Sequence, residues 1–130
     1  MRNGMRLQGL RTLVIEDVAD IRDVFVMLLH LEEADVVAAG SGREGVEIAN
    51  KLQFDVILTD LGLPDMAGDT IIREMRNSAG GSHALVVVIT GYGEPYVSQA
   101  RHAGADAVFM KPIEWTDLVE YVRQSVPLAA

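Results

Sequence analysis

Near the middle of the chain, the sequence reads Val56-Ile57-Leu58-Thr59-Asp60-Leu61-Gly62-Leu63-Pro64. The first four of these residues are apolar or β-branched, which is typical of a short strand buried on both faces of a sheet. Gly62 and Pro64 come soon afterwards and predict a turn. Asp60 is therefore expected at the carboxyl end of a central strand, where open α/β sheets bind their ligands.

Three other apolar segments also end in polar residues. Because the carboxyl ends of parallel strands meet at one edge of a sheet, these polar residues are expected to form one cluster with Asp60. The segments and their endings are 13–15 with Glu16 and Asp17, 85–89 with Thr90 and Gly91, and 107–110 with Lys111 and Pro112.

Strand-like and helix-like patterns alternate five times along the chain. This alternation predicts an α/β fold with a doubly wound, five-stranded parallel sheet and five helices on its two faces. Strands are expected at 12–15, 36–39, 56–59, 85–89 and 107–110, each followed by a helix, of which the fourth, at 96–103, is weak. The first helix is expected to begin at Asp20 as its cap and to face the core with one stripe: Ile21, Val24, Phe25, Leu28 and Leu29.

Length and composition restrict the function classes. The 130 residues suit one domain, and the net charge of −8 argues against direct binding of nucleic acids, which needs a basic face. The absence of cysteine excludes disulfides and thiolate metal sites and predicts a cytoplasmic location. Residues 1–10 contain no apolar core of a signal peptide, and no segment reaches the roughly 18 apolar residues of a membrane helix.

The expected cluster contains three carboxylates, on Glu16, Asp17 and Asp60. These groups repel one another unless a cation neutralises them, and an all-oxygen set favours a hard ion such as Mg²⁺. Lys111 offers an ammonium and Thr90 a hydroxyl to a phosphate, and the amides of two glycines can approach the same anion: Gly62 and Gly91. A carboxylate in these surroundings can attack a phosphoryl group and form an acyl phosphate.

These residues, in this order and spacing, resemble the receiver domain of two-component response regulators. The resemblance covers about residues 11–126 and places Asp60 at the phosphoacceptor position. Glu16 and Asp17 match the family's acid pair, Thr90 its hydroxyl and Lys111 its lysine. The family's other matched positions are a proline, a glycine and a second proline, held here by Pro64, Gly68 and Pro112. It implies a flavodoxin-like fold with strand order 2-1-3-4-5. We expect an N-terminal extension at 1–10, the receiver domain at 11–127 and a C-terminal tail at 128–130.

The resemblance also implies a function. Asp60 would take phosphate from a histidine kinase or a histidine phosphotransfer protein and switch a face that binds an unknown downstream protein. Mg²⁺, for which Mn²⁺ can substitute, would be bound directly by Asp17, Asp60 and the carbonyl of Gly62, and by Glu16 through water. The protein would be a signalling module with only slow self-dephosphorylation rather than an enzyme, and a monomer or weak dimer. A cis peptide bond is implied between Lys111 and Pro112.

The sequence departs from the family pattern at Val108, where an aromatic residue usually stands three positions before the lysine. Phe109 follows, and strand alternation points it to the other face of the sheet. The segment 91–103 is the alternative carrier of the switch. Tyr92 is interpreted either as covering the site or as contacting a partner, and both readings stay open.

Three alternatives remain beside a stand-alone receiver. One is a receiver excised from a hybrid histidine kinase, and another is a receiver-shaped module that never carries phosphate. The third is a Mg²⁺-dependent phosphohydrolase with an aspartate nucleophile. Such enzymes usually carry a second aspartate two residues after the nucleophile, a position held here by Gly62.

Overall fold

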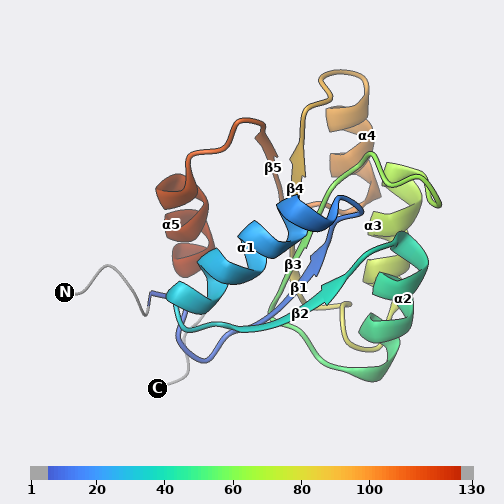
Figure 1. Ribbon diagram of the computed structural model, residues 1–130. Coiled ribbons are helices and arrows are strands. Elements are labelled where there is room, and N and C mark those ends of the chain that lie inside the picture. The colour runs from blue at the N-terminus through green and yellow to red at the C-terminus, as the bar shows by residue number, and fades with distance from the viewer. Residues whose placement is uncertain (1–5, 127–130) are drawn as a thin grey trace.

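Five strands alternate with five helices in the computed structural model, which describes residues 6–126 (Figure 1). The expected element order is confirmed, and the bounds of β3, α4 and β5 agree with those expected from the sequence. The elements are β1 Arg11–Ile15, α1 Ala19–Leu31, β2 Asp35–Ala39, α2 Gly42–Lys51, β3 Val56–Thr59, α3 Gly68–Asn77, β4 Leu85–Thr90, α4 Tyr96–Ala103, β5 Ala107–Met110 and α5 Trp115–Ser125.

All neighbouring strands are parallel, and their order is β2-β1-β3-β4-β5, as expected for a flavodoxin-like fold. The central strand, β3, is buried at all four positions, and its Leu58 lies in register with Val14 of β1 and Val87 of β4. Because all five strands run in one direction, their carboxyl ends lie along one edge of the sheet.

The sheet separates two apolar clusters, because successive side chains of a strand point to opposite faces. Ile57 packs in the cluster covered by α2, α3 and α4, which includes Ile72 of α3 and Ala100 of α4. Leu58 packs in the other cluster, with Leu29 of α1 and residues of α5 such as Leu118. Figure 1 shows these two helical layers on either side of the sheet.

The stripe expected to bury α1 is only partly correct. Leu29 is buried and Phe25 packs against the core, Leu28 is half-buried, and Ile21 and Val24 are exposed. These two side chains join others on the outer face of α1 in an exposed apolar row, which we call the α1 strip: Ile21, Val24, Met27 and Leu31, exposed by 38%, 49%, 54% and 63%. Apolar residues therefore occupy two adjacent faces of this helix, and only one of them contacts the sheet.

The beginning of α1 also differs from expectation. The helix begins at Ala19 with Val18 as its N-cap residue, and no side chain caps it, so the prediction that Asp20 is the cap is wrong. Asp20 lies in the first turn, where its negative charge is favourable toward the helix dipole. In α2, by contrast, Ser41 caps the helix by accepting a hydrogen bond from the Glu44 amide at 3.1 Å.

The segment before β1 packs against the core. Leu7 and Leu10 are buried in the cluster under α1 and α5. The Arg6 guanidinium donates to the Glu32 carboxylate at 2.6 and 3.0 Å, at the end of α1. The first five residues of the expected N-terminal extension and the expected tail at 128–130 lie outside the described residues. None of the described helices has the length and apolarity that a membrane crossing requires.

Candidate functional site

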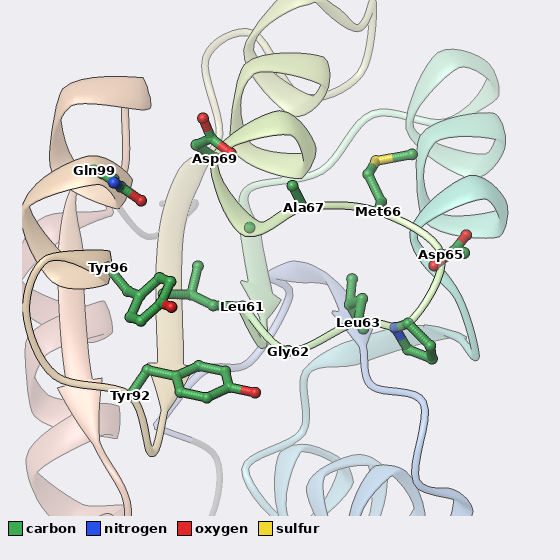
Figure 2. Close-up of a pocket in the computed structure, with 12 residues that line it drawn as sticks. Leu61, Gly62, Leu63, Asp65, Met66, Ala67, Asp69, Tyr92, Tyr96 and Gln99 are labelled. Atoms are coloured by element: carbon green, nitrogen blue, oxygen red, sulfur yellow. The ribbon is translucent and has the colours of Figure 1, made fainter.

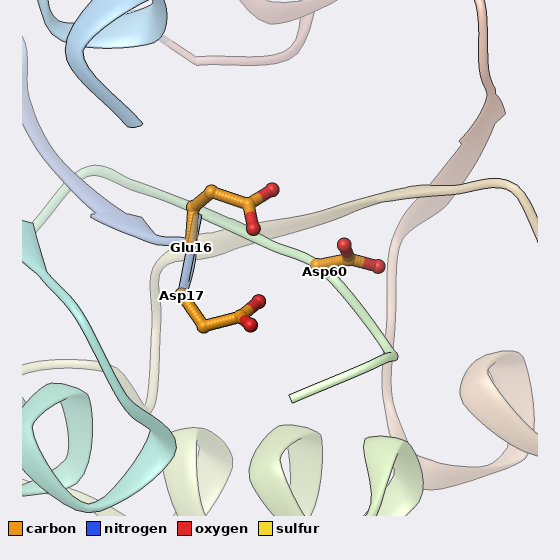
Figure 3. Close-up of side chains that lie close together, drawn as sticks. All are labelled: Glu16, Asp17 and Asp60. Atoms are coloured by element: carbon orange, nitrogen blue, oxygen red, sulfur yellow. The ribbon is translucent and has the colours of Figure 1, made fainter. Parts of the chain in front are cut away.

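The polar strand ends meet at the carboxyl edge of the sheet, as predicted. Glu16 and Asp17 follow β1, and Asp60 follows β3. Each of these three residues offers a carboxylate oxygen, and the three oxygens lie within 4.8 Å of one another. Figure 3 shows Glu16 and Asp17, neighbours in the chain, lying beside Asp60 of the adjacent strand. The three carboxylates therefore form a compact anionic cluster.

Asp60 is held on both of its carboxylate oxygens. Oδ1 accepts hydrogen bonds from the amides of Leu61 at 2.7 Å and Gly62 at 3.2 Å. Oδ2 accepts from the Lys111 ammonium at 3.1 Å. The turn that follows β3 therefore supplies donors on one side of the carboxylate, and β5 supplies a cation on the other.

Glu16 is the most buried member of the cluster, with a side chain only 4% exposed. Burial raises the pKa of Glu16 above its ordinary value, and Asp17 and Asp60 act in the same direction. The Val18 amide, which donates to Glu16 at 3.2 Å, and Lys111, which lies 3.7 Å from it, oppose this rise in pKa. A further cation in the cluster would keep Glu16 ionised.

The cluster fits a hard divalent cation. Its three candidate ligands are all carboxylate oxygens, the donor type that Mg²⁺ and Mn²⁺ prefer. Oxygens bound to one Mg²⁺ lie at most about 4.2 Å apart, twice the metal–oxygen distance of about 2.1 Å. Small movements of these side chains would therefore bring all three into range of one ion.

Thr90 ends β4 beside this cluster and is fully buried. Its hydroxyl oxygen accepts a hydrogen bond from the Tyr92 amide at 3.0 Å, and its carbonyl accepts from the Lys111 amide at 2.9 Å. Gly91, between Thr90 and Tyr92, is exposed, and a Cβ atom built there would meet no other described atom within 4 Å. Thr90 is thus connected both to the lysine and to the loop that leads into α4.

The Tyr92 ring lies against Gly62, two residues after Asp60 (Figure 2). A Cβ atom built at Gly62 would lie 3.1 Å from Tyr92 Cε2 and 3.2 Å from its hydroxyl oxygen. A larger residue at position 62 would therefore push the ring away. The structure places Tyr92 beside the candidate site while leaving about half of its surface exposed.

The structure confirms the expected directions of the β5 side chains. Val108 packs against the cluster on the α2, α3 and α4 side, whereas Phe109 packs on the opposite side, with its ring centroid 5.7 Å from that of Tyr121. Phe109 therefore cannot replace the aromatic side chain missing at position 108. The Lys111–Pro112 peptide bond is cis, as the resemblance implied, and so is Glu94–Pro95, which sequence reasoning did not identify.

Sequence reasoning missed two residues that support the site. The Arg22 guanidinium, on α1, donates to the carbonyl of Glu16 at 2.9 Å and so holds the acid pair in place. The Asp65 carboxylate accepts from the amides of Arg43 and Gly42, both at 2.9 Å, and these two bonds hold the pKa of Asp65 below its usual value. An acid after Pro64 hints at a helix cap, but nothing local indicates that its partner is α2, some 20 residues earlier.

Comparison with protein families gives one match over most of the chain. The model of the response regulator receiver domain matches residues 12–123. A response regulator receiver protein of Anaeromyxobacter sp. (strain Fw109-5) is 30% identical over 103 residues, which cover 79% of this chain and 43% of that protein. The cell cycle response regulator CtrA of Brucella ovis is 30% identical over 117 residues, 90% of this chain and 50% of that protein. The chain therefore spans half or less of the length of these relatives.

Solved structures show the same fold. A CheY-like response regulator receiver domain protein of Methanospirillum hungatei is 29% identical, with a TM-score of 0.82 over 88% of this chain and 90% of that one. The receiver domain of a sensor histidine kinase of Pseudomonas aeruginosa is 23% identical, with a TM-score of 0.81 over 89% and 96% of the two chains, and was solved with magnesium in its active site cleft.

Proposed function

This chain belongs to the response regulator receiver domain family, and from that membership we propose that Asp60 is the residue that accepts the phosphoryl group. Receiver domains are phosphoacceptor modules of two-component signalling, not phosphohydrolases. One observation carries the proposal. Asp60 is the carboxylate at which two amide donors, the Lys111 ammonium and two further carboxylates converge.

In the proposed reaction, a carboxylate oxygen of Asp60 attacks the phosphorus of a phosphohistidine. A phosphorus–oxygen bond forms, the phosphorus–nitrogen bond breaks, and the histidine keeps its electron pair. Lys111, the Thr90 hydroxyl and the amides of Gly62 and Gly91 would stabilise the charge on the transferred oxygens. Phosphate in this position would attract the hydroxyl of Thr90, which now accepts from Tyr92 and still has a proton to donate.

Glu16, Asp17 and Asp60 are the residues that would hold Mg²⁺, with the carbonyl of Gly62 as a further ligand and Glu16 acting through water. The ion would neutralise charge on the phosphoryl oxygens and on the cluster itself. Mn²⁺ would suit the same oxygen donors. This assignment is supported by the close approach of the three carboxylates, which lie within 4.8 Å and include one that is almost fully buried.

Receiver membership implies a histidine kinase as partner, and we propose that the α1 strip is the surface on which the phosphodonor docks. The strip is exposed and apolar, and α1 begins only three residues after Glu16, at the edge that carries the site. Exposed apolar rows of this kind mark contact surfaces. Met27→Glu should slow transfer from a phosphorylated histidine donor without affecting labelling by acetyl phosphate; equal transfer rates would contradict this docking site.

A cytoplasmic location stays part of the proposal, because histidine phosphodonors of this type act in the cytoplasm and a chain without cysteine suits a reducing compartment. The net charge of −8 supports a role without direct binding of nucleic acids. A monomer or weak dimer stays the prediction for its assembly, and sedimentation velocity would test it.

Intact mass after treatment with acetyl phosphate and Mg²⁺ tests the central proposal. Wild-type protein should gain one phosphoryl group, and the gain should disappear without Mg²⁺ or in Asp60→Asn. Asp117→Asn, which removes an exposed acid from the first turn of α5, is the matched control and should be labelled normally. Normal labelling of Asp60→Asn would show that another residue is the acceptor.

A further inference from the structure

A groove of about 530 Å³ lies between the loop after β3 and the beginning of α4. One side is formed by the loop from Gly62 to Gly68, and the other by Tyr92, Tyr96 and Gln99 (Figure 2). Its volume falls within the range of about 300–1,000 Å³ that is common for ligand sites. Of the residues that line this groove, only Gly62 has a role in the proposed phosphoryl transfer.

The lining of the groove favours a cation. Tyr92 and Tyr96 are 49% and 50% exposed, and their ring centroids lie 5.2 Å apart. Asp65 and Asp69 lie opposite them, and among the described residues that line the groove there is no lysine, arginine or histidine. Aromatic faces and carboxylates both attract cations, and a planar guanidinium suits the two together.

Both acids of the groove remain negatively charged. The amides of Arg43 and Gly42 hold the pKa of Asp65 below its usual value, and the Arg73 guanidinium, 2.9 Å away, does the same for Asp69. Each carboxylate oxygen can accept more than one hydrogen bond, so these contacts leave acceptor capacity for a guest.

Each side of the groove is attached to the phosphoacceptor site. Leu61 and Gly62, at one side, donate their amides to Asp60. Tyr92, at the other, donates its amide to the Thr90 hydroxyl, and its ring touches Gly62. The end of the groove nearest Gly62 therefore lies directly beside Asp60.

We propose that this groove binds an extended segment of a partner protein that presents an arginine between apolar residues, and that phosphorylation strengthens the binding. The second part rests on the proposed role of Asp60. At constant Mg²⁺, conversion of its carboxylate to an acyl phosphate adds about one negative charge. One added charge near a cation in a watery site should tighten binding about two- to fourfold.

Charge and shape argue for this occupant. The chain has a net charge of −8, so a basic segment is attracted from a distance, whereas a second copy of the same acidic chain is repelled. Apolar neighbours of the arginine can contact the side of the groove formed by Leu63, Pro64 and Met66.

A peptide titration followed by amide NMR tests the inference. The probe is an acetylated and amidated Leu-Arg-Leu-Leu peptide, and its control carries citrulline, which has nearly the same shape without the charge. The arginine peptide should shift the signals of Gly62, Tyr92, Tyr96 and Gln99, and the citrulline peptide should bind at least about fivefold more weakly. Equal affinities, or shifts elsewhere only, would overturn the inference.

Charge variants on the exposed face of α4 sharpen the test. Gln99→Lys should lower the affinity for the arginine peptide several-fold, and Gln99→Glu should raise it. Gln124→Lys, at an exposed position on α5, should leave this affinity unchanged. If all three variants bind alike, the groove is not the binding site. A dimer that forms through the groove in sedimentation velocity would show that a second copy, not a basic segment, occupies it.

Repeating the titration with Mg²⁺ and beryllofluoride, an acyl-phosphate mimic, separates the two proposals. Tightening of about two- to fourfold supports the coupling. If intact mass shows phosphorylation of Asp60 but beryllofluoride leaves the peptide affinity unchanged, the coupling is wrong while the proposed function stands. If Asp60 is not phosphorylated, the proposed function fails, and the citrulline and Gln99 comparisons still decide whether the groove binds arginine.

Discussion

The Lys111 ammonium already lies where an incoming phosphoryl group would need a cation, 3.1 Å from Asp60 and 3.7 Å from Glu16. In the cluster of carboxylates it balances part of the negative charge before any phosphate arrives. Its backbone amide is tied to the Thr90 carbonyl at 2.9 Å, so the residue is anchored at the end of β5. The positioning of this cation is therefore achieved on folding rather than during the reaction.

Lys111→Ala should fold, because the side chain is partly exposed, but should accept phosphate at least about 100-fold more slowly, the usual effect of losing one charge-stabilising donor. Lys111→Arg keeps the charge with a different geometry, and its rate of phosphate acceptance should lie between those of the wild type and Lys111→Ala. The initial rate of mass gain with acetyl phosphate measures the effect, and circular dichroism checks the fold. A wild-type rate for Lys111→Ala would remove this residue from the mechanism.

Residues at the site differ in how far the sequence reveals them. Glu16, Asp17, Asp60 and Lys111 could be predicted to meet because each follows a strand of one parallel sheet. Arg22 could not, because its contact with the carbonyl of Glu16 depends on how α1 crosses the sheet.

The sequence predicts Tyr96 only as the first residue of the weak helix at 96–103. Its ring lies beside that of Tyr92, with centroids 5.2 Å apart, and no local pattern in the sequence indicated this pairing.

Among the elements, the connection between α3 and β4 is the most tightly packed around a glycine. The Gly80 amide donates to the Ala49 carbonyl at 2.7 Å, and its own carbonyl accepts from the Phe54 amide at 3.0 Å. A Cβ atom built at Gly80 would lie 1.6 Å from the carbonyl oxygen of Leu52. This glycine therefore joins the end of α2 to the start of β3 at a distance that no side chain permits.

Gly80→Ala should lower the free energy of unfolding by about 2–3 kcal/mol, because the backbone of α2 must move to accommodate the methyl group. Gly91→Ala is the control, since a Cβ atom there would meet no other described atom within 4 Å. Its free energy of unfolding should change by less than about 0.5 kcal/mol. Urea titrations of both variants make the measurement, and equal stabilities would show that the connection relaxes freely.

Element positions were easier to predict than element faces. Gly62 and Pro64 follow β3 and indicate where the strand ends, and the bounds of β3 agree with those expected. In α1, however, Ile21, Val24, Phe25 and Leu29 are all apolar, and periodicity alone cannot decide which of two adjacent apolar faces meets the sheet. The structure exposes the first two, and they belong to the α1 strip.

At the scale of the whole molecule, the pair of Arg6 and Glu32 ties the segment before β1 to the end of α1. Burial alone would raise the pKa of Glu32, but the hydrogen bonds and charge of Arg6 outweigh it, and the pKa lies below its ordinary value. Because this pKa is lower in the folded protein than in the unfolded chain, the pair stabilises the fold at neutral pH. That stabilisation disappears as the pH falls below about 4.3 and through the folded pKa.

Glu32→Gln should therefore reduce the free energy of unfolding at pH 7 by about 1–3 kcal/mol. Below pH 5, the free energy of unfolding of this variant should fall less steeply with pH than that of the wild type, since the titrating group is gone. Glu47→Gln, at an exposed position of α2, is the control and should keep the wild-type profile. Urea unfolding across this pH range provides the comparison; a parallel decline in Glu32→Gln would assign the acid sensitivity to other carboxylates.

Amide exchange measured along the whole chain should show where switching takes place. Val108 has no ring to move when Thr90 is drawn toward a phosphoryl group, whereas Tyr92 is bonded to Thr90 through its amide. Helix α4 is short and buries only Ala100 and Ala103, so it belongs to the easily opened part of the fold. Beryllofluoride with Mg²⁺ should therefore increase the amide exchange protection of residues 91–103 more than that of β5. Protection gained only around Val108 would show that the change follows β5 instead.

The separation of the two apolar clusters by the sheet has a consequence for speed. Asp60, Gly62 and Tyr92 lie at the carboxyl edge, outside both clusters, and only Leu61 between them belongs to the cluster on the α2, α3 and α4 side, so the cluster under α1 and α5 need not repack when this path changes. Loop motions take nanoseconds to microseconds, whereas local unfolding takes microseconds to seconds. A response confined to this edge should follow the phosphoryl group almost without delay. The duration of a signal would then be set by the chemistry of making and breaking the acyl phosphate, not by the protein's own relaxation.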